Sequence, residues 1–75
     1  MNARIGDIVL YRSHGTRDGR HKPAHLPLLV VERRQGDDET VLVSGWVYYV
    51  DGLRYHDDVP YSDDESQRAT WTNRP

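Results

Sequence analysis

Apolar residues in this chain recur at every second position or in short runs, and no long window shows the spacing of three and four that marks a helix. The opening segment GDIVLYR is the clearest strand. After a Gly-Asp turn, Ile8 and Leu10 fall on one face of this strand. Val9 and Tyr11 fall on the other. The pattern therefore predicts an all-β protein.

Two further strands follow from the apolar runs in the middle of the chain. Leu26–Arg34 is a continuous apolar run that turns charged, and Pro27 restricts its beginning to an edge or a strand start. Gln35–Glu39 (QGDDE) is a turn sequence, because Gly and Asp tolerate the backbone conformations that turns need. Thr40–Trp46 is the next strand, with Gly45 expected at a bulge or a sharp bend.

The strongest local signal is a β-hairpin. Asp51 and Gly52 separate two β-rich runs and are typical of a type I′ turn. Such a turn would pair Val47–Val50 with Leu53–His56.

These elements predict one domain over residues 1–75. It has a strand-rich core over about 5–56, an acidic loop over 57–68 and a short last strand over 69–72. The expected architecture is a small five-stranded SH3-like barrel or a curled antiparallel sheet. The expected core is Ile8, Leu10, Leu29, Val31, Val41, Val43 and Trp71.

The order of the elements carries the resemblance to SH3-like barrels. A long loop follows the first strand, a tight hairpin comes later, and GDIVLY is similar to the start of the first strand in many such barrels. The resemblance implies that Arg12–His25 forms the long first loop. The peptide-binding motif ALYDY is absent, so recognition of proline motifs is not implied.

A second resemblance spans most of the chain. GDIVLYRSHGT, an apolar strand and then VPY and TW near the end resemble short uncharacterised proteins of actinobacteria and their phages. This resemblance implies a phage or high-GC bacterial source, and the absence of Cys fits a protein of the host cytoplasm or of the virion. It implies no activity for any residue.

Composition narrows the chemistry. The chain has no Cys, which removes disulfides and thiolate metal sites. No apolar run approaches the roughly 20 residues of a membrane span, so no membrane partner is expected. The net charge is −2, with seven basic and three acidic residues over 1–34 and three basic and nine acidic residues over 35–75. The acidic half is expected either to cap the basic loop or to leave two faces of opposite sign.

Metal binding and catalysis have little support in this sequence. His21 and His25 have the spacing of a helical zinc pair, but Pro23 lies between them and excludes a helix. Ser13 and His14 are neighbours on the chain and point to opposite sides, so adjacency does not make a nucleophile and its base. A barrel this small is also expected to lack a pocket of the usual size. We therefore expect no enzyme, no metal and no cofactor.

Basic and aromatic residues are the best candidates for binding. The candidate partner-binding residues are Arg12, Arg17, Arg20, Lys22, Trp46, Tyr48, Tyr49 and Tyr55. Tyr, Trp and Arg dominate protein-interface hot spots, which favours a non-catalytic module that acts by protein–protein contact. It would be a virion or assembly component or a host-protein binder, and a homo-oligomer is compatible with either. The alternative is a nucleic-acid-binding SH3-like barrel that grips phosphates with the basic loop 12–25.

Overall fold

The computed structural model describes residues 3–15, 19–20 and 22–74. Within these residues the chain forms five strands and no helix, which confirms the all-β prediction. The strands are β1 (Ile8–Arg12), β2 (His25–Gln35), β3 (Val41–Tyr49), β4 (Gly52–Pro60) and β5 (Thr70–Thr72).

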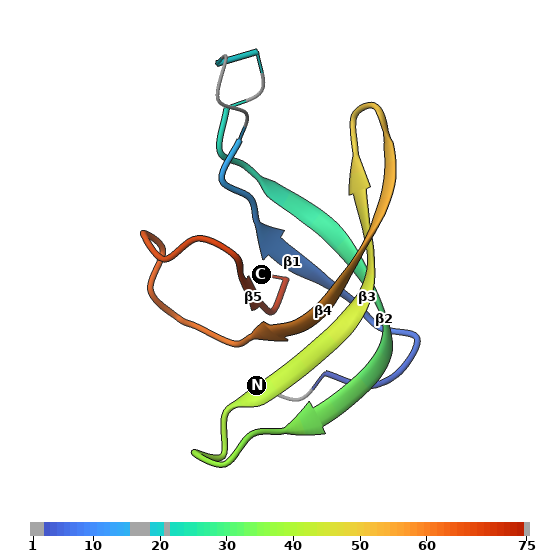
Figure 1. Ribbon diagram of the computed structural model, residues 1–75, viewed down its shortest axis with the longest axis vertical. Helices are drawn as coiled ribbons and strands as arrows, with labels where there is room; N and C mark the ends of the chain where they lie inside the picture. Colours follow the sequence, from blue (N-terminus) through green and yellow to red (C-terminus); the bar gives the residue numbers. More distant parts are fainter. Residues whose placement is uncertain (1–2, 16–18, 21, 75) are drawn as a thin grey trace.

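All of the strand pairs are antiparallel and make one sheet in the order β4-β3-β2-β1-β5. The sheet curls strongly into a half-barrel, with β5 at the edge beside β1 (Figure 1). The two edge strands approach each other at one end, where an isolated bridge joins Tyr61 to Trp71. The Ser62 amide donates to the Trp71 carbonyl there, over 3.1 Å. The expected curled antiparallel sheet is thus observed.

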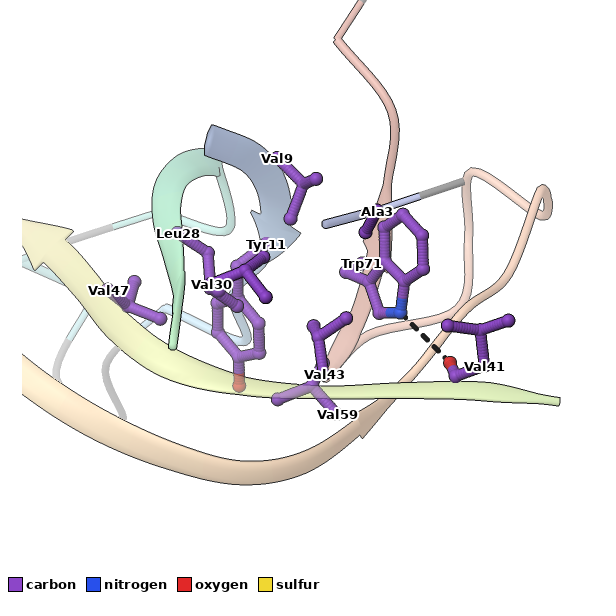
Figure 2. Packing of buried hydrophobic residues seen from close by; sticks show 10 residues of the cluster. All are labelled: Ala3, Val9, Tyr11, Leu28, Val30, Val41, Val43, Val47, Val59 and Trp71. Atoms are coloured by element: carbon purple, nitrogen blue, oxygen red, sulfur yellow. Dashed lines mark hydrogen bonds between the residues drawn. The ribbon is translucent and has the colours of Figure 1, made fainter. Parts of the chain in front are cut away.

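The hydrophobic core fills the lower part of the concave face. Trp71 is fully buried at its centre, and its indole Nε1–H donates to the carbonyl oxygen of Val41 over 3.1 Å (Figure 2). The indole thereby ties β5 to β3, across the open side of the sheet. The buried apolar residues are Ala3, Val9, Tyr11, Leu28, Val30, Val41, Val43, Val47, Val59 and Trp71.

The expected core was wrong on the first two strands. Val41, Val43 and Trp71 are buried as predicted, but β1 buries Val9 and Tyr11 in place of Ile8 and Leu10. On β2, Leu28 and Val30 are buried, whereas Leu29 and Val31 are only partly covered. Alternate residues point to opposite faces of a strand, and here both faces are apolar, so the alternation did not say which face turns inward.

Gly45 lies at the bend of β3, as predicted. The register between β3 and β4 shifts between Val43 and Gly45, and the register between β2 and β3 shifts opposite, between Val30 and Glu32. A Cβ at Gly45 would fall on the backbone carbonyl of Leu29, so only glycine lets the two strands approach this closely. The two irregularities sharpen the curl of the sheet.

The β3–β4 hairpin exists, but its turn lies one residue earlier than predicted. Tyr49 pairs with Gly52, so Val50 and Asp51 form the turn. Neither has a positive φ, which a type I′ turn requires at both positions, so the predicted turn type is wrong. The turn over Gln35–Glu39 is observed, closed by the Gly36 amide donating to the Thr40 carbonyl over 2.8 Å.

Strand β4 also runs further than predicted, through residues expected to open the acidic loop. Asp57 and Asp58 lie within it and form a bulge opposite Ser44 of β3, and Asp58 has a φ of 49°. The Asp58 amide donates to the Ser44 hydroxyl over 2.9 Å, which satisfies the backbone where the ladder is interrupted. An acidic sequence can therefore extend an exposed edge strand when a bulge accommodates it.

Candidate functional site

Arg12 does not belong to the exposed loop in which the sequence placed it. It is the last residue of β1, and it is 1% exposed. Its Nη1 donates to the Ser62 carbonyl over 2.8 Å and to the Thr70 hydroxyl over 3.0 Å. Among the described residues no carboxylate forms an ion pair with it. Arg12 is thus occupied inside the molecule, holding the 62–70 segment against β1, and the expectation that it lies in the exposed loop is wrong.

The concave face opens into a cleft beyond the core. This cleft of about 520 Å³ lies between the segment that follows β1 and the β3–β4 hairpin. Figure 1 shows both arms extending from the same end of the curled sheet. The volume is within the range of ordinary ligand sites, roughly 300–1,000 Å³. The expectation that so small a protein lacks a pocket was wrong, because the cleft is built between two arms rather than inside a barrel.

Three stacked rings form one side of this cleft. The imidazole of His56 packs between Tyr11 and Tyr49, with ring centroids 4.7 Å and 6.0 Å away. The Tyr49 hydroxyl is hydrogen-bonded to Nε2 of His56 at 2.9 Å. Burial, helped by the charge of Arg54, lowers the pKa of His56, and burial raises the pKa of both tyrosines. This side of the cleft is therefore uncharged at neutral pH.

The rim of the cleft carries mostly positive charge. Arg20 and Lys22 line it from the arm after β1, and Arg54 lines it from β4. The Arg54 guanidinium lies 4.5 Å from the ring centre of Tyr49 and 3.4 Å from the carboxylate of Asp51. Asp51 is the one acidic residue among the described residues of the lining. The lining of the cleft thus combines apolar side chains with a cationic mouth.

The convex side of the sheet presents a second apolar surface. The strand registers place Ile8 opposite Leu29, Leu29 opposite Trp46, and Trp46 opposite Tyr55. These four residues form a continuous row across β1, β2, β3 and β4, which we call the outer row. Ile8, Trp46 and Tyr55 are each about two-fifths exposed. The neighbouring cross-strand pair, Tyr48 with Leu53, is exposed as well.

The predicted partner-binding residues therefore separate onto two faces. Trp46, Tyr48 and Tyr55 lie on the convex side, whereas Arg20, Lys22 and Tyr49 line the cleft. Arg17 lies outside the described residues, as does His21 of the metal hypothesis.

Sequence reasoning missed two groups of residues at these sites. Arg54 and His56 were seen only as strand residues, although their spacing of two on β4 places them on one face. Ile8 and Leu29 were assigned to the core, although they lie in the outer row. Period-two alternation was the available signal for both groups, but alternation alone does not show which face of a strand is buried.

Part of the acidic half is neutralised away from the cleft. Arg34 on β2 and Asp58 on β4 form a bidentate ion pair, with both nitrogen–oxygen distances at 2.9 Å. The pair lowers the pKa of the Asp58 carboxyl, chiefly by hydrogen bonding. Asp58 is therefore paired with Arg34 of β2 and not with the basic loop.

Other side-chain chemistry is sparse in the described part of the chain. Among these residues no group of three His, Asp or Glu side chains gathers in a way that could hold a metal ion. The Ser13 hydroxyl is bonded to the backbone of Ala24, donating to its carbonyl over 3.2 Å and accepting from its amide over 3.1 Å. Ser13 thus closes the base of the arm rather than facing a histidine base.

Comparisons of the chain with protein-family models, with curated proteins and with solved structures found no significant match. In the described residues, no helix has the length and apolar character needed to cross a membrane.

Proposed function

We propose that this protein is a non-catalytic binding module that acts by protein–protein contact through the convex side of its sheet. The observation that carries the proposal is the outer row, which runs unbroken across four strands. An antiparallel sheet with one buried face normally alternates apolar residues inward with polar residues outward. Here the outward positions hold Ile, Leu, Trp and Tyr.

The residue types of the outer row suit a protein partner. Trp46 and Tyr55 pack edge to face, with ring centroids 5.3 Å apart, which holds both rings in place on the surface. Large aromatic side chains on a rigid strand pair supply much contact area at a low entropic cost. An SH3-like architecture and a phage or high-GC bacterial source are consistent with this role as a virion component or a host-protein binder, and both remain proposals.

The test is a display selection against protein fragments of the source organism, with the wild-type protein as bait. We expect enriched binders that lose affinity about tenfold or more for a Trp46→Ser/Tyr55→Ser variant, because hot-spot truncations typically cost more than 1–2 kcal/mol. Ile5→Ser is the matched control, since Ile5 is 71% exposed and lies outside the outer row.

Two outcomes would contradict the proposal. One is a set of binders with equal affinity for the wild type and the double variant. The other is a wild-type dimer in sedimentation experiments that the same two substitutions dissolve, because the surface would then bind a second copy of the chain.

A further inference from the structure

We propose that the concave cleft binds an acidic peptide segment, with a carboxylate held between Lys22 and Arg54 and a neighbouring apolar side chain packed below it. The cleft lies on the opposite face of the sheet from the outer row. The proposal therefore does not rest on the proposed function and can fail or succeed separately from it.

The charge at the mouth favours an anion. Lys22 and Arg54 approach from the two arms, and Arg20 lines the same side as Lys22. Arg54 is already placed by its contact with the Tyr49 ring, and its side chain remains 58% exposed. Its hydrogen bond to Asp51 is long, at 3.4 Å, and both side chains are exposed. A ligand carboxylate can therefore share Arg54 with Asp51, or displace Asp51 from it, at little cost in free energy.

Apolar side chains in the lining favour an apolar group beside that anion. Leu26 and Pro23 line one side of the cleft, and Val50 lines the other at the tip of the hairpin. Val50 is 89% exposed in the free protein, the largest value among the exposed large apolar residues described. A ligand that covers it removes apolar surface from water. An acidic side chain flanked by an aliphatic one matches both features.

The surroundings favour a peptide over a nucleic acid. Bases would need open aromatic faces, but Tyr11 is only 5% exposed and the rings of Tyr49 and His56 are already packed against their neighbours. A long polyanion would also meet a chain with a net charge of −2 and an acidic second half. A short peptide places its charge only at the cationic mouth.

The sheet supplies a further reason for a peptide. The cleft is bounded by β4, which is an edge strand whose one neighbour in the sheet is β3. A peptide lying along β4 can pair with its backbone, as in recognition by strand addition. Side chains of the peptide would then alternate between the cleft and solvent, so an acidic and an apolar residue two positions apart would both face the cleft.

The experiment is an NMR titration of the labelled protein with the acetylated and amidated hexapeptide Glu-Glu-Leu-Leu-Glu-Glu, called the Glu-Leu peptide, which presents both residue types on each face when extended. The matched Gln-Leu hexapeptide and hexathymidylate are the comparison probes. We expect shifts to concentrate at the amides of Tyr11, Tyr49 and His56, with affinity for the Gln-Leu peptide about tenfold lower, as for loss of a charge-assisted contact. A Lys22→Gln/Arg54→Gln variant should lose a similar factor.

Two control variants separate the possible results. Arg33→Gln removes an exposed charge that does not line the cleft and should leave the affinity unchanged. The Trp46→Ser variant should also bind the Glu-Leu peptide with wild-type affinity, whether or not the proposed function is correct. The proposal is overturned if the Glu-Leu peptide does not bind, if the Gln-Leu peptide binds equally well, or if hexathymidylate binds more tightly than the Glu-Leu peptide.

Discussion

The burial of Arg12 shows how strongly the surroundings of a residue determine its role. Arg12 and Arg33 are the same residue type near the ends of apolar runs, yet Arg12 is 1% exposed and Arg33 is exposed. Arg12 bonds the Ser62 carbonyl and the Thr70 hydroxyl, and its own carbonyl accepts from the Ala69 amide over 2.8 Å. The side chain therefore links β1 to the segment that leads into β5.

Replacement of Arg12 should destabilise the protein rather than weaken partner binding alone. Arg12→Ala removes two hydrogen bonds from a charged donor and leaves a cavity, so we expect a loss of about 2–4 kcal/mol in the free energy of unfolding. Arg33→Ala, at an exposed position, should change it by no more than about 0.5 kcal/mol. Urea unfolding followed by circular dichroism measures both. Equal stability of the two variants would show that Arg12 is not a structural residue.

At the scale of the strand, β1 is apolar on both sides. Ile8 faces outward and is 41% exposed, whereas Val9 faces inward and is 3% exposed. The two neighbours have similar intrinsic preferences for strands, since both are β-branched. Their different surroundings come only from the direction in which the sheet curls.

These two positions give a test of the observed core face. Val9→Ala should cost about 2 kcal/mol of unfolding free energy, because it removes buried methyl groups and leaves a cavity. Ile8→Ala removes more carbon atoms but should cost less than about 1 kcal/mol, because they are partly solvated already. Thermal unfolding of the two variants measures the difference. A larger loss of unfolding free energy for Ile8→Ala than for Val9→Ala would contradict the observed core face and support the one expected from the sequence.

At the scale of the whole molecule, the curled sheet is closed by its C-terminal segment. β5 adds to β1, and Trp71 reaches across to the carbonyl of Val41 on β3 (Figure 2). The Tyr61 ring packs edge to face on the indole, with centroids 4.9 Å apart. One side chain thereby fills the interior and connects strands far apart in the sheet.

The two tryptophans of the chain should therefore respond very differently to truncation. Trp71→Ala should cost about 3–5 kcal/mol. That is much of the roughly 4–11 kcal/mol expected for the unfolding of a domain of this size. We expect this variant to be largely unfolded at 37 °C by circular dichroism. Trp46→Ala should remain folded, since Trp46 is 41% exposed. A folded Trp71→Ala variant with near-native stability would contradict this account of closure.

Local patterns were sufficient for the elements of this fold. Period-two alternation predicted the strands, and Gly36 with its acidic neighbours predicted the turn over Gln35–Glu39. Gly45 predicted the bend in β3, because a strand glycine commonly marks a bulge or a close approach of two backbones. These features depend on contacts between near neighbours in the chain or on the backbone of one residue.

Only the tertiary structure decided which face of the sheet is buried and which residues meet in the cleft. Alternation defines two faces of a strand but gives them no inside or outside when both are apolar, as in β1. The burial of Arg12 and the placing of Lys22 and Arg54 along one cleft depend on segments far apart in the sequence. Sequence alone therefore determined the strands and most of the turns, whereas the direction of curl, a property of the packed sheet, created the core, the cleft and the exposed outer row.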